Sequence, residues 1–163
     1  MRKSFSSDIV KAIQKFVLSG GSYLGICGGA FMASQGWEIE TGFVEGFGLA
    51  PATTDYFIDD QTPMILPVKW KGLARNMYYQ AGPKFELTPS REPVEKVAFY
   101  EDGSIAALMC AYGGGKVFVS GPHPEADQSW LVEDGLSLVG WTSTSSLAVA
   151  VIKDLISDHA IGK

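Results

Sequence analysis

The chain has 163 residues, of which 46% are hydrophobic and 19% are charged, and its formal net charge is −5. This composition indicates one globular domain over residues 1–163 and argues against intrinsic disorder. The acidic balance provides no basic stripe for nucleic-acid phosphates, and no uncharged stretch is continuous enough to predict a membrane span. We therefore expect neither nucleic acid nor membrane as a partner.

The first third of the chain predicts α/β architecture. Residues 6–19 have helical periodicity, with Ser6 or Ser7 as N-cap and glycines at the end. Residues 22–26, SYLGI, form a nearly all-apolar run typical of a strand buried on both faces of a parallel sheet. Residues 28–35 then begin a second short helix. The residues expected on the apolar face of the first helix are Ile9, Ile13, Phe16 and Val17.

The middle of the chain predicts antiparallel strands instead. Residues 49–63 are expected to form a loop. Two strand candidates, residues 65–70 and 74–80, are joined by a turn at residues 71–72. The last region predicts a meander followed by an amphipathic helix over residues 143–162. The meander strands are residues 95–100, 104–112 and 116–121, and the helix stripe is Leu147, Val151 and Leu155.

The apolar run at residues 22–26 raises a question about its sheet neighbours. A strand buried on both faces should have parallel neighbours on each side. Little else in the chain has the pattern of a parallel β-α-β unit. Either the last meander strand pairs beside it, or its neighbours are missing from this sequence.

Cys27 follows that run directly, in the pattern G-x-C-x-G over residues 25–29. This pattern is similar to a nucleophile elbow, in which a strand ends, the chain turns sharply and a helix begins. The helix N-terminus favours the thiolate, and the Gly28 N–H is positioned to stabilise an oxyanion. The alternative is a small cysteine that only packs between strand and helix. The second cysteine, Cys110, lies mid-strand and is expected in the core, and a reducing cytoplasm is the expected location.

His123 and Glu125 follow the end of the last predicted meander strand, in a loop stiffened by two prolines. A histidine there can take the proton of Cys27, and a carboxylate two residues later can orient the imidazole. The alternative is an ordinary turn with solvated side chains. The carboxylates of residues 55–60 are not joined by His or Cys, so no metal site and no cofactor are expected.

G-x-C-x-G followed by H-P-E at residues 123–125 resembles the class I glutamine amidotransferase superfamily. More closely, residues 20–34, 77–83 and 103–125 are similar to the amidotransferase-like N-terminal domain of biotin-protein ligases. The resemblance implies a flavodoxin-like three-layer sandwich with an antiparallel meander. It also implies a triad of Cys27, His123 and Glu125, and a pocket lined by Tyr78, Tyr79 and Gln80.

The chain departs from this family in two places. Phe31 stands where glutamine amidotransferases carry a Gln, which turns the expectation away from glutamine as substrate. Cys27 also lies too close to the start for the preceding strands and for the Gly-rich loop that supplies a second oxyanion donor. We therefore expect the N-terminal strands to be missing. Three explanations stay open: a truncated reading frame, a mis-set start codon, or a partner chain or homo-oligomer that completes the sheet.

The sequence thus predicts a cysteine-dependent amide hydrolase or amidotransferase that acts on a small-molecule amide or a peptide-like substrate. Two alternatives stay open: a non-catalytic binding or regulatory module of the same fold, and a redox-sensing thiol protein.

Overall fold

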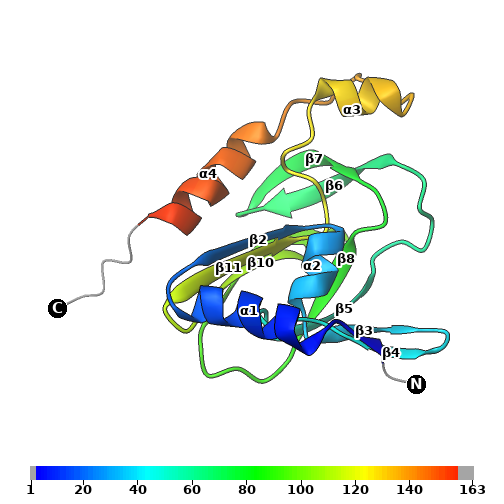
Figure 1. Ribbon diagram of the computed structural model, residues 1–163. Coiled ribbons are helices and arrows are strands. Elements are labelled where there is room, and N and C mark those ends of the chain that lie inside the picture. The colour runs from blue at the N-terminus through cyan, green and yellow to red at the C-terminus, as the bar shows by residue number, and fades with distance from the viewer. Residues whose placement is uncertain (1–2, 158–163) are drawn as a thin grey trace.

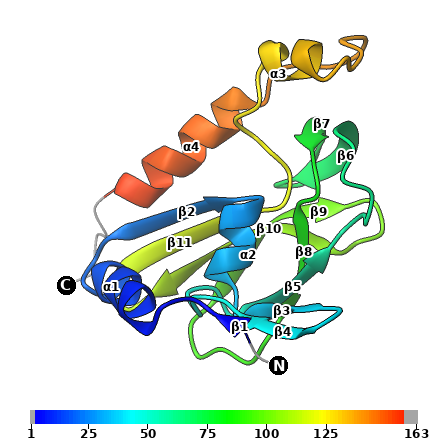
Figure 2. The same cartoon turned by 45° about the vertical axis from the view of Figure 1, so that its right-hand side comes forward.

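A computed structural model describes residues 3–157, which form one mixed sheet with helices packed around it (Figures 1 and 2). The mixed α/β class expected from the sequence is confirmed. The strands are β1 (Lys3–Ser4), β2 (Ser22–Ile26), β3 (Gly36–Ile39), β4 (Gly42–Glu45), β5 (Ala52–Tyr56), β6 (Met64–Trp70), β7 (Leu73–Tyr79), β8 (Pro83–Leu87), β9 (Val94–Tyr100), β10 (Ile105–Tyr112) and β11 (Gly115–Ser120). The helices are α1 (Ser7–Leu18), α2 (Gly28–Ala33), α3 (Gln128–Glu133) and α4 (Ser145–Ile156).

The strands β2 and β11 lie side by side and run parallel. Their register runs from the pair Ser22–Lys116 to the pair Ile26–Ser120, so both strands end at the same level. The last meander strand therefore pairs with the apolar strand. This was the first of the two alternatives considered for the neighbours of residues 22–26. Within residues 3–157, no strand pairs with the other edge of β2.

The rest of the sheet is mostly antiparallel, in the order β1-β4-β3-β5-β8-β10-β9-β6-β7, and β11 joins it through β10. The predicted meander β9–β10–β11 and the hairpin β6–β7 are confirmed. The loop expected over residues 49–63 is wrong in part, because residues 52–56 form β5, antiparallel to the unpredicted β8. These strands lack clear apolar alternation, and their partners are distant in the chain, so local pattern could not reveal them.

The two faces of the sheet near β11 are covered by different helices (Figure 1). Side chains alternate along the strand: Val117 and Val119 join the core cluster that includes residues of α1 and α2, whereas Phe118 joins the cluster of α4. Val151 and Leu155 of α4 are buried, which confirms the predicted stripe. The predicted part of that helix after residue 157, including His159, lies outside the described residues. The longest described helices, α1 and α4, have 12 residues each, too short to cross a membrane.

Helix α1 is less buried than its sequence predicts. Ser6 is the N-cap residue, but its side chain makes no capping hydrogen bond. Val17 is fully buried, whereas Ile9 is 57% and Phe16 is 61% exposed. The prediction that this whole face is buried is therefore wrong in part. Among residues 3–157 the sheet ends at β2, so it covers Val17 but leaves Ile9 and Phe16 exposed.

The central strand β10 should dominate the stability of the fold. Leu108 is fully buried in the core cluster, so Leu108→Ala leaves a cavity and should lower the free energy of unfolding by about 2–5 kcal/mol. Leu73, 59% exposed at the start of β7, is the matched control. Leu73→Ala should change the free energy of unfolding by less than about 0.5 kcal/mol. Chemical denaturation of both variants measures the difference, and equal losses would contradict this packing.

Candidate active site

Cys27 lies at the sharp turn between β2 and α2. Its backbone has φ 51° and ψ −110°, a left-handed conformation that a non-glycine residue adopts only under constraint. The Cys27 N–H donates to the carbonyl oxygen of Ser120 at 2.8 Å, which continues the β2–β11 pairing into the turn. A Cβ at Gly25 would lie 2.6 Å from the carbonyl oxygen of Gly29, so only glycine allows this close return of the helix. The sequence therefore folds locally into the predicted strand–turn–helix.

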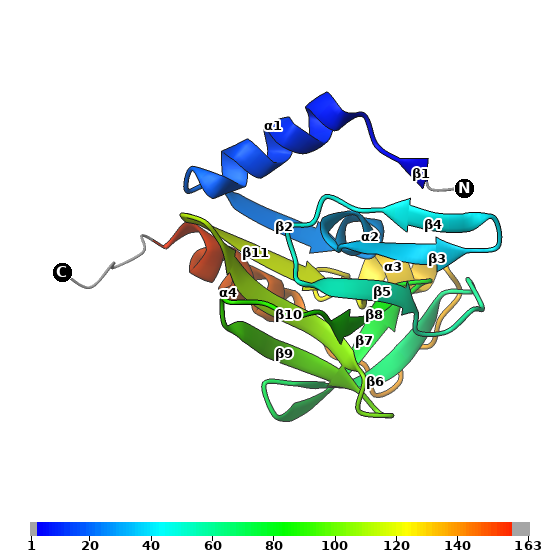
Figure 3. The same ribbon diagram turned by 90° about the horizontal axis from the view of Figure 1, so that it is seen from below.

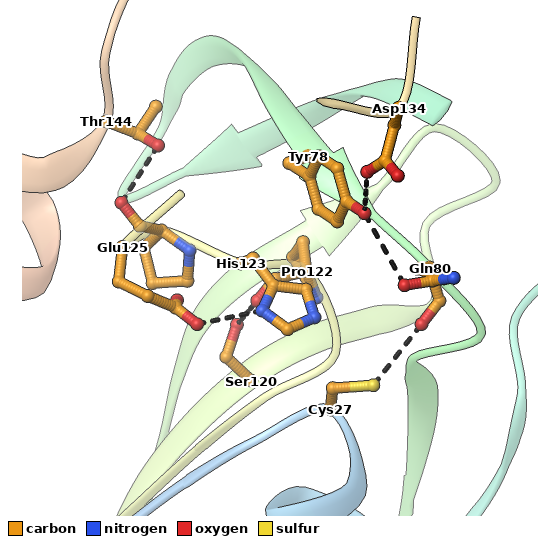
Figure 4. Close-up of polar contacts among 10 residues, drawn as sticks. Cys27, Tyr78, Gln80, Ser120, Pro122, His123, Glu125, Asp134 and Thr144 are labelled. Carbon is orange, nitrogen blue, oxygen red and sulfur yellow. Dashed lines mark hydrogen bonds and ion pairs between the residues drawn. The ribbon is translucent and has the colours of Figure 1, made fainter. Parts of the chain in front are cut away.

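His123 and Glu125 lie in the loop that leaves β11 (Figure 4). The loop is held at both sides: the Ser120 hydroxyl donates to the carbonyl of Pro122 at 2.7 Å, and the His123 N–H donates to the carbonyl of Tyr78 at 2.9 Å. Nδ1 of His123 is 2.8 Å from Oε1 of Glu125. The carboxylate thus orients the imidazole, and Oε2 of Glu125 is buried without a hydrogen-bond partner among the described residues.

The imidazole of His123 lies between Glu125 on one side and Cys27 on the other (Figure 4). Its side chain is only 13% exposed. Burial lowers the pKa of His123, but hydrogen bonds to Cys27 and Glu125 and the charges of both groups outweigh burial and raise the pKa from 6.5 to about 9. The half-buried thiol also donates to the carbonyl of Gln80, with Sγ 3.2 Å from the oxygen. Cys27 is therefore placed between the Gln80 carbonyl and an imidazole that can take and hold a proton.

The Gly28 N–H begins α2 directly after the nucleophile candidate. The first N–H groups of a helix have no intrahelical acceptor. In the described part of the chain, the Gly28 N–H donates to no protein acceptor. A Cβ at this position would meet nothing within 4 Å, so Gly28 is not enclosed on that side. Among the described residues, this amide is therefore a donor without a protein acceptor.

The three pocket residues expected from the resemblance do not lie together. Tyr78 packs edge-on against His123, with ring centroids 5.5 Å apart, and the Gln80 carbonyl accepts from Cys27. Tyr79, in contrast, is fully buried on the opposite side of the strand, and its hydroxyl donates to the carbonyl of Gly82 at 2.9 Å. Tyr78 and Gln80 thus belong to the site, whereas Tyr79 belongs to the core.

Two further residues contact this group that the sequence did not indicate. The Tyr78 hydroxyl donates to Oδ2 of Asp134 at 2.6 Å, and burial together with this bond raises the pKa of Tyr78 above its usual range. The ring of Trp130 lies 5.3 Å from the rings of both Tyr78 and His123, between centroids. Both residues come from the segment of α3, a helix too short to show periodicity in the sequence.

The remaining candidates lie outside the site. Asp127 caps α3 by accepting from the Ser129 N–H at 2.8 Å, and Cys110 is buried, which raises the pKa of its thiol to about 11. No group of three or more metal-ligating side chains occurs within residues 3–157. A cavity of about 710 Å³ lies between β3, β5 and β8, but none of Cys27, His123 and Glu125 lines it.

Sequence comparison relates the first part of the chain to a known family. Residues 2–46, which contain β2, Cys27 and α2, match the family described as biotin-protein ligase, N terminal. The match supports the relationship to the amidotransferase-like domain that the motifs suggested. No curated protein matches the chain significantly.

Solved structures extend the likeness to most of the fold. A glutamine amidotransferase has a TM-score of 0.56 at 20% identity, over 78% of this chain and 69% of that chain. A cytoplasmic protein from Salmonella typhimurium LT2 has a TM-score of 0.55 at 14% identity, over 91% of this chain and 60% of that chain. A catalytic mutant of a GH42 β-galactosidase from G. stearothermophilus has a TM-score of 0.54 at 12% identity, over 95% of this chain and 20% of that chain. The chain thus spans less than two thirds of the last two proteins, and at these identities the likeness concerns the fold alone.

The raised pKa of His123 can be measured directly by NMR titration of its ring protons. The wild-type ring should titrate near pH 9, and Glu125→Gln should lower its pKa by at least about one unit, because burial then opposes protonation with one partner fewer. Asp127→Asn is the matched control, since it removes an exposed carboxylate two residues further on and keeps an N-cap residue. An unchanged pKa in Glu125→Gln would contradict the described coupling.

The same pKa shift makes the free energy of unfolding depend on pH. The folded pKa of about 9 exceeds the ordinary value of 6.5, so protonated His123 stabilises the fold fully below pH 6.5, and this contribution is lost as pH rises through 9. The wild type should therefore be more stable than Glu125→Gln at pH 6.5, and the difference should shrink towards pH 9. Denaturation of both proteins at the two pH values measures it, and a difference that grows with pH would contradict the sign.

Proposed function

We propose that this chain is an amidotransferase-like domain that hydrolyses or transfers an amide group through Cys27, His123 and Glu125. The observation that carries the proposal is the coupling of His123 to both other groups: Nδ1 is 2.8 Å from Glu125 Oε1, and Cys27 helps to raise the pKa of the ring. A nucleophile, a base and a group that orients the base form the arrangement needed for covalent catalysis.

In the first step, His123 accepts the proton of the Cys27 thiol, and the thiolate attacks the amide carbonyl carbon. A pKa near 9 means that the imidazole holds this proton at neutral pH, while Glu125 stabilises the imidazolium. The new S–C bond moves the carbonyl electron pair to oxygen. The Gly28 N–H is the proposed donor to this oxyanion.

In the second step, the imidazolium gives its proton to the amide nitrogen, the C–N bond breaks and an amine leaves. The product is a thioester on Cys27. Water or an acceptor amine, deprotonated by His123, then attacks the thioester and releases the thiol. Tyr78 and Gln80 are the proposed walls of the substrate pocket, since they lie against His123 and Cys27.

The substrate class follows in part from Phe31. Phe31 is buried and packs against the rings of Trp37 and Tyr56, at centroid distances of 5.5 and 5.0 Å. It therefore offers no polar group at the position where glutamine amidotransferases carry a Gln. We assign the site to a small-molecule amide or peptide-like substrate other than free glutamine.

Two finer expectations belong to the same proposal. A flavodoxin-like three-layer order is supported by α1 and α4, which lie on opposite sides of the β2–β11 pair (Figure 1). A reducing, cytoplasmic setting is supported by two free thiols, Cys27 and Cys110, and by the similar fold of the cytoplasmic protein from Salmonella typhimurium.

Alkylation of Cys27 by iodoacetamide tests the triad without a known substrate. Cys27 should react faster than Cys110, whose thiol is buried with a pKa near 11. His123→Ala should slow the reaction at pH 7 by about tenfold or more, because the thiolate loses its imidazolium partner. Cys110→Ala is the matched control and should keep the wild-type rate. A rate unchanged in His123→Ala would contradict the proposal.

Mass spectrometry after incubation with p-nitroanilides supplies a second measurement. An acyl group on Cys27, absent from His123→Ala, is the expected result. If dilute peroxide instead converts Cys27 into a stable sulfenic acid, and no acyl group forms, the redox-sensing alternative is favoured. If neither modification forms, the non-catalytic alternative is favoured.

A further inference from the structure

The open edge of β2 lacks the features that usually protect an edge strand. Edge strands are normally blunted by charged residues, by proline or by a bulge. Residues 22–26 contain no charge and no proline, and they pair with β11 in unbroken register. Leu24 is 43% exposed on the strand itself. The edge is therefore a regular, uncharged template for another strand.

Helix α1 extends this surface beyond the strand (Figure 3). A Cβ at Gly21 would lie 2.4 Å from Cε1 of Phe16, so the Phe16 ring lies over the residue that precedes β2. Ile9 lies two helical turns before Phe16 on the same side, and both are more than half exposed. The exposed apolar stripe of α1 thus extends to Gly21, the residue directly before the edge strand β2.

We propose that a second copy of this chain covers this surface, with β2 pairing antiparallel to β2 of the second copy. A two-fold axis perpendicular to the sheet through the new strand pair produces this arrangement. The same axis keeps both α1 helices on one face and makes them antiparallel neighbours. The two sheets then continue into each other, and no edge remains exposed at β2.

The charges of α1 favour this occupant over an unrelated partner. In an antiparallel helix pair centred near Ala12, Ile9 meets Phe16 of the second copy, and Asp8 meets Lys15 of the second copy. Asp8 and Lys15 lie next to the apolar stripe, are exposed and form no ion pair within residues 3–157. Ala12 at the crossing point is small enough for close approach. The surface is therefore complementary to itself in both apolar contacts and charge.

The oligomeric state of the 163-residue chain tests this proposal by light scattering coupled to size exclusion. The wild type should be a dimer at micromolar concentration. Phe16→Glu should raise the dimer dissociation constant by at least about tenfold, because it buries an unpaired charge. Leu73→Glu is the matched control: Leu73 is 59% exposed, near the 61% of Phe16, but lies in β7 at the far edge of the sheet.

A charge exchange separates this interface from any other dimer. Asp8→Lys and Lys15→Asp should each weaken the dimer by about three- to tenfold, because each places like charges opposite one another. The double variant should restore wild-type association. Since both side chains are exposed, thermal unfolding should show that all three variants stay folded.

Two results would overturn the proposal. The first is a wild-type chain that stays monomeric at all accessible concentrations. In that case no second copy covers the edge. Alternatively, a dimer would form but respond to none of the α1 variants. Neither result bears on the reactivity of Cys27, because Asp8, Phe16 and Lys15 lie in α1 and touch no residue of the triad.

Discussion

The parallel pairing of β2 with β11 is the constraint on which the site depends. Because Ile26 pairs with Ser120, both strands end at the same level, and the turn at Cys27 and the loop to His123 leave the sheet side by side. The bond from the Cys27 N–H to the Ser120 carbonyl at 2.8 Å ties the two exits together. A slip of one residue would move His123 by about 3.3 Å along the strand and turn β11 side chains to the wrong face.

A third strand, β7, completes the site from the opposite direction. The carbonyl of Tyr78 holds the His123 N–H, and the carbonyl of Gln80 accepts from the thiol. Ala81, the next residue, has φ 52°, so a second left-handed residue directly follows the one whose carbonyl contacts Cys27. Backbone strain of this kind persists only where the surrounding structure enforces it. Here three strands enforce it, and the result is a histidine held between a thiol and a carboxylate.

The strand that precedes Cys27, β2, lies at the edge of the sheet that residues 3–157 form. Among residues 3–157, β2 pairs with β11 on one side only, and α1 and α4 lie against its two faces. Its apolar composition suits a strand with neighbours on both sides, and Leu24 of β2 and Phe16 of α1 are both exposed. The nucleophile turn thus follows directly after the strand that forms this edge.

The sequence by itself determined the elements with strong local signals. The apolar strand, the glycines around Cys27, the hairpin turns and the helix period of α4 depend on neighbours in the chain, so pattern sufficed to predict them. β5, β8 and α3 were missed because their stability comes from distant partners or from a single capping residue. Only the tertiary structure decided that Tyr78 faces His123 while Tyr79 enters the core. The sequence shows that neighbouring side chains of a strand point to opposite faces of the sheet, but it does not show which face is which. Only packing, likewise, revealed Asp134 and Trp130 behind the site and left half of the apolar face of α1 uncovered.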